Sequence, residues 1–271
     1  MHYQTYPPSS HLAPLIKCFW SLEFSATLQP EKQTIIPDGC MELIIHYGDL
    51  YQQFREDSSS FVQPRSFVFG QLSNTLKIAP TGHTGIIAAR FNHDGFIPLA
   101  TIPLAGMENR AVPLSELFGE EGNFLEKNVL SAPTQAERIQ HIETFLLARL
   151  NKLEVLDRIV QSSIEILLSQ AGQISVEEIV EKLNINRRNL ERKFSTNVGL
   201  SPKQLSKIIR LQAALKQLNQ NTELSLTELA YQNGYFDQSH FIKDFKAFTG
   251  ISPKQFYADH LQLSALFIGT K

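Results

Sequence analysis

The sequence predicts an α+β protein of two domains, with a β-rich domain at the N-terminus and an all-helical domain at the C-terminus. Short apolar runs in residues 1–132, separated by glycine and Asn/Asp clusters, are typical of strands in an antiparallel sandwich or barrel. Beyond residue 157, apolar residues recur three and four positions apart, which is the spacing of a helical face. A chain of 271 residues with 42% hydrophobic composition can build two modest cores.

The charge of the chain is uneven. The net charge of −2 does not by itself indicate a nucleic-acid-binding protein. Residues 157–258 carry 13 Lys and Arg against 10 Asp and Glu, whereas the remainder carries 12 against 17. A nucleic-acid-binding surface must therefore come from local clustering. One such cluster is Arg187, Arg188, Arg192 and Lys193, although a basic cluster alone is usually a solvated helix face.

The cysteine content and the hydropathy pattern predict a cytoplasmic protein without a membrane span. The two cysteines, Cys18 and Cys40, form no C-x-x-C motif and are too few for a disulfide scaffold. The N-terminus lacks a basic region followed by an apolar run, so no signal peptide is expected. No window reaches the roughly 20 apolar residues that a transmembrane helix needs.

The first domain is expected to span residues 1–132, with its clearest strands at 40–47, 66–69 and 85–91. Trp20, the single tryptophan, admits two interpretations. A tryptophan beside an aromatic neighbour in a strand usually packs in a core. The sharper hypothesis is that Trp20 forms the wall of a pocket for an apolar or aromatic effector. Glu42 could also point inward, but the alternation of its strand leaves the direction undecided.

The histidines of this domain are the candidates for the metal site of an enzyme. His46, His83 and His93 form no H-x-H motif with a following glutamate, and zinc and iron sites need several converging ligands. The chain has no G-x-S-x-G motif, and neither cysteine has a recognisable base partner. We therefore expect no catalytic residue, no metal and no cofactor. The alternative is a metal-dependent enzyme barrel joined to a DNA-binding domain.

Residues 133–156 are expected to connect the two domains. Thr134 and Glu137 form the S/T-x-x-E capping box that starts a helix. An apolar stripe follows at helical spacing, so this helix must pack against something. It either pairs with the same helix of a second subunit, which we favour slightly, or packs on the β-rich domain. The stripe is Ile139, Ile142, Phe145, Leu146, Leu150 and Leu153.

The second domain, residues 157–271, contains an internal duplication. Residues 185–205 read INRRNLERKFSTNVGLSPKQL, and residues 236–256 read FDQSHFIKDFKAFTGISPKQF. At an offset of 51 the apolar positions of each second helix match, and the sequence G-x-S-P-K-Q recurs after it. Each copy places two short amphipathic patterns around a turn. This spacing predicts two helix–turn–helix units.

Local signals mark the ends of these helices. A helix is predicted from Asp157 to about Ser169, and a capping box of Ser175 and Glu178 starts the next one. Asn186 and Asp237 stand where the N-cap of each second helix belongs. At the turns, Asn184 matches Gly234, and both residue types tolerate a positive φ.

Two helix–turn–helix units joined by one helix, with G-x-S-P after each second helix, resemble the AraC family of bacterial transcription regulators. The resemblance covers roughly residues 157–260, and its most specific part is A-x4-Y-F-D-Q-S-H-F-x3-F-K-x3-G-x-S-P, from Ala230. It implies that the chain binds promoter DNA, works with RNA polymerase and can form a homodimer. Activation or repression, the operator and the regulated genes are not implied.

The first domain resembles the sensing domain of a subgroup of the same family. This resemblance implies a cupin-like barrel or sandwich whose interior or mouth accepts a small-molecule effector of unknown identity. The residues that carry it are Pro14-Leu15, Phe19-Trp20, the turn Ile36-Pro37-Asp38-Gly39-Cys40 with Glu42-Leu43, Gly70, and Ile86 to Phe91 with Gly95.

The family resemblance assigns DNA contact to the exposed face of each second helix. Arg188, Glu191 and Arg192 are expected to meet bases, since arginine can bond guanine and glutamate can accept from cytosine. Arg187 and Lys193 flank them and are expected to contact phosphate. The second copy is less basic, so we expect mainly phosphate contacts there, with an adenine contact for its glutamine. The residues of the second copy that are expected to contact DNA are Gln238, Ser239, His240 and Lys243.

The helix between the units sets their separation. From Pro202 to about Leu218 it would be roughly 25 Å long at about 1.5 Å per residue. With the width of the flanking units, this approaches the ~34 Å of one DNA turn, so both units could enter successive major grooves. The apolar tail at 258–271 could form a short extra helix that covers the helical domain.

Overall fold

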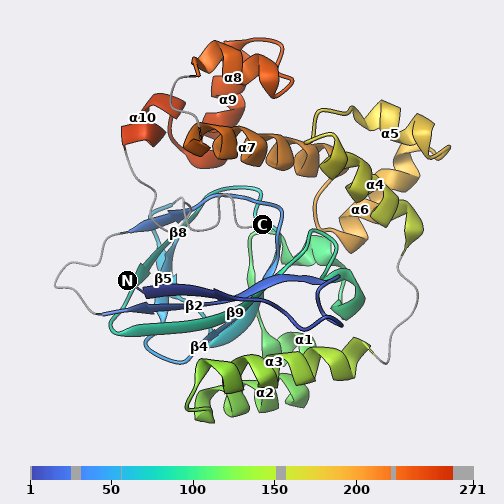
Figure 1. Ribbon diagram of the computed structural model, residues 1–271. Helices are drawn as coiled ribbons and strands as arrows, with labels where there is room; N and C mark the ends of the chain where they lie inside the picture. Colours follow the sequence, from blue (N-terminus) through green and yellow to red (C-terminus); the bar gives the residue numbers. More distant parts are fainter. Residues whose placement is uncertain (1, 26–31, 56, 151–156, 221–223, 259–271) are drawn as a thin grey trace.

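The computed structural model describes residues 2–25, 32–55, 57–150, 157–220 and 224–258. The end of the predicted connection, residues 151–156, and the apolar tail beyond residue 258 lie outside the described residues. The described part folds as a sandwich of two antiparallel sheets followed by a helical domain (Figure 1). The predicted α+β fold class is therefore confirmed, with the sandwich as the architecture of the N-terminal domain.

Among the described residues, the larger sheet has six strands in the order β1-β2-β9-β4-β7-β10, and the smaller sheet has four in the order β3-β8-β5-β6. The paired strands run antiparallel in both sheets. Their bounds are β1 His2–Tyr6, β2 Ile16–Phe24, β3 Gln33–Ile35, β4 Glu42–His46, β5 Tyr51–Phe54, β6 Ser60–Val62, β7 Ser66–Phe69, β8 Leu76–Pro80, β9 Thr84–Phe91 and β10 Ala111–Pro113.

Strand β9 lies inside the larger sheet and is buried along its whole length. Successive side chains of a strand point to opposite faces. Ile87 and Ala89 therefore pack in a core on the outer face, whereas Ile86 and Ala88 pack in the core between the sheets. Burial on both faces explains why this segment is nearly all apolar instead of alternating with polar residues.

Three helices cover the outer face of the larger sheet, on the side away from the helical domain (Figure 1). They are α1 Leu114–Phe118, α2 Glu120–Ser131 and α3 Gln135–Leu150. As predicted, the Thr134 hydroxyl before α3 accepts a hydrogen bond from the Glu137 amide, at 3.2 Å. Ile142 and Leu146 are fully buried in the core on the outer face of the larger sheet. This helix thus packs on the β-rich domain, and a homodimer through the same region stays a prediction.

The helical domain is built around one long helix. Its elements are α4 Arg158–Ser169, α5 Val176–Lys182, α6 Arg187–Asn197, α7 Pro202–Gln220, α8 Leu226–Gln232, α9 Gln238–Thr249 and α10 Pro253–Ala258. Helix α7 lies between α4–α6 on one side and α8–α9 on the other (Figure 1). Its apolar residues share a single core with those of both units. The two helix–turn–helix units therefore form one packed body.

The duplication is visible at the level of single residues. Asn184 and Gly234 both have a positive φ, 49° and 68°, in the turns of the two units. The side chain of Asn186 caps α6, and that of Asp237 caps α9, as predicted. Capping boxes also start the first helix of each unit, at Ser175 with Glu178 and at Ser225 with Glu228. These caps fix where the second helix of each unit begins. These second helices, α6 and α9, are called the recognition helices below.

The two domains contact each other through the turns of the sandwich and the helices α6 and α7. Two 3₁₀ helices, η1 Ile97–Leu99 and η2 Leu104–Met107, connect β9 to β10. Gly199, just after α6, lies against the backbone of η2, since an added Cβ would come within 2.8 Å of the Leu104 carbonyl oxygen. Ile36, from the turn between β3 and β4, is buried in the helical core.

Candidate DNA interface and effector pocket

Helix α6 has an inner and an outer face. Leu190 and Phe194 are fully buried in the helical core, as the i, i+4 spacing predicted. Arg188 and Arg192, also four residues apart, are exposed on the other side. Arg192 donates a hydrogen bond to the side chain of Asn189, at 3.0 Å, within the same helix. The two arginines therefore form a basic ridge that is available to an external partner.

The other predicted contacts of α6 are engaged in ion pairs. Arg187 pairs with Glu177 of α5 and with Glu191, whose carboxylate lies 2.9 Å from its Nε. The hydrogen bond that Arg187 donates to Glu191 raises the pKa of Arg187. Lys193 is half-buried and pairs with Asp157, the N-cap of α4. Lys193 thus holds α6 to α4, a role that its sequence position did not indicate.

Helix α9 repeats this layout with fewer charges. Phe241 and Phe245 are fully buried, with ring centroids 5.6 Å apart. Ser239, His240 and Lys243 are exposed on the outer face. Gln238 is half-buried and accepts a hydrogen bond from the Thr227 hydroxyl, at 2.9 Å. The outer face of α9 can therefore donate and accept hydrogen bonds, but it carries less positive charge than α6.

Polar contacts fasten both units to α7. Lys207 Nζ lies 2.9 Å from the Asp244 carboxylate of α9. On the side of the first unit, Ser206 and Arg210 both donate to the carbonyl of Gly172, each at 2.8 Å. Since these bonds join α7 to the turn after α4 and to α9, the two recognition helices keep a fixed separation as long as α7 is intact.

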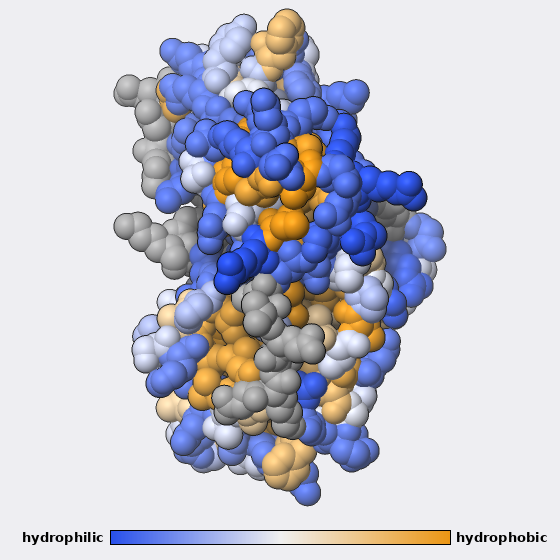
Figure 2. Space-filling view, turned by 90° about the vertical axis from the view of Figure 1, so that its right-hand side faces the viewer, coloured by the Kyte–Doolittle hydropathy of each residue, from blue (hydrophilic) through white to orange (hydrophobic). Residues whose placement is uncertain are grey.

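Figure 2 shows the face of the molecule that carries α4, α5 and α6. Hydrophilic side chains cover most of the helical domain there, around one apolar area. A polar surface of this kind can meet the phosphate backbone of DNA without burying unpaired groups.

A cavity of about 80 Å³ lies between the two sheets of the sandwich. Such a volume holds roughly five water molecules, so a larger guest needs neighbouring side chains or turns to move. The wall is mainly apolar and comes from both sheets. Among its residues are Trp20, Leu22, Ile44, Phe69, Leu76 and Ile78. The structure places Trp20 in the wall of this cavity and in the apolar core between the sheets, at 4% exposure, so its role toward an effector stays a prediction.

The polar residues of the cavity lie at its two ends. Strand register pairs Glu42 with Arg90 and His46 with Ile86, so the two ends are four residues, or about 13 Å, apart. At the first end, Arg90 donates to Glu42 at 3.1 Å and pairs with Asp38. Glu42 also accepts from the Trp20 indole at 3.2 Å, which settles its inward direction. Burial raises the pKa of Glu42 to about 7 and lowers that of Arg90 to about 10.

His46 marks the other end of the cavity. Its ring stacks on Tyr51 with a centroid separation of 5.8 Å and lies 5.7 Å from Phe67. Burial lowers the pKa of His46 to about 4, so the ring is neutral near pH 7. Neither Arg90 nor Asp38 was predicted as a site residue. The available signal was a single charged residue, Arg90, within the otherwise apolar run 85–91.

The three histidines considered for a metal do not meet. His83 is exposed in the turn before β9, and the ring of His93 contacts the Gly39 carbonyl at 2.7 Å. In the part of the chain that the structure describes, no three His, Cys, Asp or Glu side chains are grouped as a metal site requires. Cys18 and Cys40 are buried free thiols whose pKa burial raises.

Two family models match the chain. Residues 4–113 match a family described as a domain of unknown function, DUF6597. Residues 179–259 match a family described as a helix-turn-helix domain. This second match covers α6 to α9 and thus both recognition helices, which confirms the helix–turn–helix prediction.

Several curated relatives are similar to part of the chain. An uncharacterized HTH-type transcriptional regulator from Haemophilus influenzae is 32% identical over 93 residues, which cover 34% of this chain and 31% of that protein. The transcriptional activator RhaS from Escherichia coli is 29% identical over 84 residues, or 31% and 30% of the two chains. MtrA from Neisseria gonorrhoeae is 34% identical over 82 residues, or 30% and 27%. The chain thus matches about a third of the length of these relatives.

Solved structures were also found that are similar to the chain. ToxT from Vibrio cholerae has a TM-score of 0.49 at 12% identity, over 94% of this chain and 98% of that chain. The C-terminal domain of AraT from Geobacillus stearothermophilus has a TM-score of 0.36 at 29% identity, over 40% and 96%.

The relatives bear on two further predictions. All of the curated relatives above are named as transcription regulators, in agreement with the prediction that the chain is not an enzyme. No helix within the described ranges has the length and apolarity of a membrane span.

The helix-turn-helix match, the named relatives and the duplicated, capped units lead to one conclusion. Residues 179–259 thus belong to the helix-turn-helix domain family, and the two units keep the resemblance to the AraC family on which the DNA-binding prediction rests.

Proposed function

We propose that the protein is a cytoplasmic transcription regulator that binds promoter DNA through both helix–turn–helix units and responds to a small molecule bound in the sandwich. The observation that carries the DNA-binding part is the pair of capped recognition helices, α6 and α9, on one connecting helix. At about 1.5 Å per residue, the 19 residues of α7 span roughly 28 Å. With the width of the flanking units, this approaches the ~34 Å between successive major grooves.

The exposed residues of α6 support distinct roles. Arg188 and Arg192 are the side chains that we assign to base contact, because an arginine can bond two acceptors of guanine. Glu191 can accept from cytosine only after it leaves Arg187, so its contact involves an exchange of partners. Arg187 would then be released toward phosphate. Lys193 adds positive potential near the backbone while it stays paired with Asp157.

The second unit supplies a less basic contact. Gln238, Ser239, His240 and Lys243 lie at the start and on the outer face of α9, where side chains of a helix–turn–helix reach DNA. Lys243 is the only lysine or arginine among these four residues. We therefore assign mainly phosphate contacts to this helix, with Gln238 as the residue suited to adenine.

The experiment that tests DNA binding starts from a pool of random duplexes from which the protein selects its preferred sequence. Affinity for that sequence is then measured by fluorescence anisotropy for wild type, Arg192→Ala and Arg158→Ala. Arg158 is an exposed arginine at the start of α4 and serves as the matched control. A lost guanine contact costs about 1–3 kcal/mol, so Arg192→Ala should weaken binding roughly 5- to 150-fold. Equal affinities of Arg192→Ala and wild type would contradict the assignment.

The effector part of the proposal is supported by the cavity between the sheets. A largely apolar space with a few polar groups at its ends is the usual form of a small-molecule site.

Contact with RNA polymerase follows from the family resemblance. A homodimer is supported by the surface groove between α2 and α3, where Phe124 is 64% exposed. Sedimentation analysis of wild type and Phe124→Ser tests it, since a monomeric wild type would contradict the proposed dimer.

A further inference from the structure

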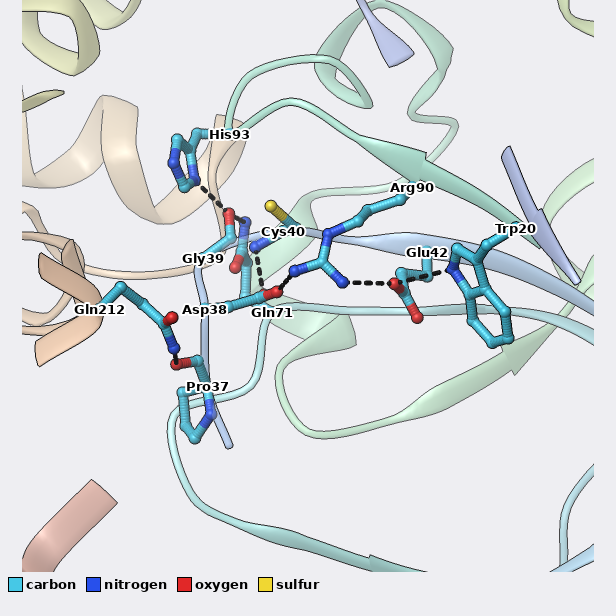
Figure 3. Close-up of polar contacts among 10 residues, drawn as sticks. All are labelled: Trp20, Pro37, Asp38, Gly39, Cys40, Glu42, Gln71, Arg90, His93 and Gln212. Atoms are coloured by element: carbon cyan, nitrogen blue, oxygen red, sulfur yellow. Dashed lines mark hydrogen bonds and ion pairs between the residues drawn. The ribbon is translucent and has the colours of Figure 1, made fainter. Parts of the chain in front are cut away.

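One turn of the sandwich touches both the cavity and the helical domain. It is the turn 36–40 between β3 and β4, which we call the coupling turn (Figure 3). On the cavity side, the carboxylate of Asp38 pairs with Arg90, and Arg90 in turn donates to Glu42. The same Asp38 accepts from the amide of Cys40 at 2.9 Å, so the ion pair also fixes the shape of the turn.

The other side of the coupling turn contacts α7. The Pro37 carbonyl accepts a hydrogen bond from the Gln212 side chain, at 2.8 Å. Gly39 has a φ of +76°, and an added Cβ would lie 3.0 Å from a methyl group of Leu205. The side chain of Ile36 is 4% exposed and belongs to the helical core. Three of the five residues of the coupling turn thus contact the helical domain.

The point of contact matters because α7 carries both recognition helices. Leu205 and Gln212 lie on the same helix as Ser206, Lys207 and Arg210, which fasten it to the two units. A displacement of the coupling turn would therefore change the docking of both units at once. The contact of η2 with Gly199, in contrast, lies at the end of α6 and not on α7.

The two partners of the ion pair differ in their access to water. The side chain of Arg90 is 2% exposed, whereas that of Asp38 is 19% exposed. Asp38 can become hydrated if the turn moves, but an unpaired guanidinium inside the cavity would be strongly unfavourable. Arg90 would keep its bond to Glu42 but lose one of its two carboxylate partners, so the opening of the pair is favoured when another acceptor reaches Arg90. Because the wall between the two polar ends is apolar, the incoming molecule would combine an anionic group with an apolar body.

We propose that Asp38 acts as a latch: an anionic group of a ligand in the cavity replaces it on Arg90 and releases the coupling turn from α7. This inference rests on the proposed effector site and names the chemistry of its ligand and the route of regulation. The exchange replaces one carboxylate–guanidinium pair by another, so the cavity keeps the same net charge. The coupling is reciprocal, so a change at α7 must also be felt at the cavity.

The first measurement uses the protein alone. Amide hydrogen exchange is compared between wild type, Asp38→Asn and the control Asp57→Asn, an exposed aspartate of the same domain. The latch predicts roughly tenfold faster exchange at residues 205–212 in Asp38→Asn, because local opening there becomes easier. In the reverse direction, Gln212→Ala should change the emission of Trp20, while Lys216→Ala, an exposed residue of α7, should not. Unchanged exchange at 205–212 in Asp38→Asn, or unchanged Trp20 emission in Gln212→Ala, would overturn the coupling.

The second measurement tests the ligand chemistry. A panel of aryl and alkyl carboxylic acids and their primary amides is screened by thermal shift and Trp20 emission. Acids should bind and their amides should not, and Asp38→Asn should bind the acids roughly tenfold more tightly because the competing carboxylate is gone. A merely structural Asp38 would give weaker binding in this variant. Absence of acid binding, or equal binding of amides, would overturn the latch. Neither measurement contains DNA, so a failure of DNA binding would contradict the proposed function separately.

Discussion

Gly199 and Gly250 occupy equivalent places in the two repeats but have different surroundings. Both follow a recognition helix, with φ values of 84° and 77°. An added Cβ at Gly199 would lie 2.8 Å from the Leu104 carbonyl oxygen of the sandwich, whereas at Gly250 it would meet only a methyl group of Thr75, at 4.0 Å. Substitution by alanine therefore imposes the same backbone strain at both positions but a clash between domains at one.

The magnitudes follow from these two effects. An alanine at positive φ costs about 1–2 kcal/mol, which is the full effect expected for Gly250→Ala. Gly199→Ala adds an overpacking cost of about 1–3 kcal/mol, because the contacted atom belongs to backbone and has little freedom to move. In a protein of this size, the difference corresponds to a melting temperature lower by on the order of 5 °C.

Differential scanning calorimetry of wild type, Gly199→Ala and Gly250→Ala measures the difference. We expect the melting temperature of the helical domain to be lower in both variants than in wild type, and lowest in Gly199→Ala. If the two variants have equal melting temperatures, η2 does not bear on α6 in solution, and the docking of the two domains described above is wrong.

Three further predictions concern the caps, the cavity and the DNA contacts. Asp237→Ala removes the N-cap of α9 and should lower the unfolding free energy by about 1 kcal/mol, whereas Asp237→Asn, which keeps a capping acceptor, should be nearly neutral in urea denaturation. His46 has a pKa of about 4 in the folded protein against 6.5 for the ordinary side chain, so the unfolded chain takes up a proton first as the pH falls. The free energy of unfolding should therefore keep this contribution above pH 6.5 and fall by up to about 3 kcal/mol toward pH 4. In His46→Gln the free energy of unfolding should depend less on pH over this range. Parallel pH profiles of the variant and wild type would contradict the role of His46. Lys243→Ala should reduce the slope of log affinity against log salt by about 1, as the loss of one phosphate contact requires, and an unchanged slope would remove Lys243 from the interface.

The features predicted from the sequence are those that local chemistry determines. The caps at Ser175, Asn186 and Asp237 depend only on residues within one turn of the helix, and each is found where predicted. The positive φ of Asn184 followed from its match to Gly234 in the repeat. The inward direction of Leu190 and Phe194 followed from helical spacing.

The features that escaped prediction depend on residues distant in sequence. Arg90 and Asp38 are 52 positions apart, and only the strand register and the shape of the coupling turn bring them together. The direction of Glu42 was undecided because its strand is covered on both faces: Glu42 and His46 face the cavity, whereas Leu43 and Ile45 pack in the core on the outer face. Lys193 looked like a phosphate contact because its partner, Asp157, is 36 positions away.

We propose above that this protein recognises promoter DNA through the exposed ridge that Arg188 and Arg192 form on α6. The most direct test maps the DNA fragments bound by the tagged protein across the genome of its host, for wild type, Arg192→Ala and the control Arg158→Ala. We expect enrichment of a small set of promoters that is lost in Arg192→Ala and kept in Arg158→Ala. Enrichment that is the same in all three proteins would contradict the claim, because the DNA would then be recognised through another surface.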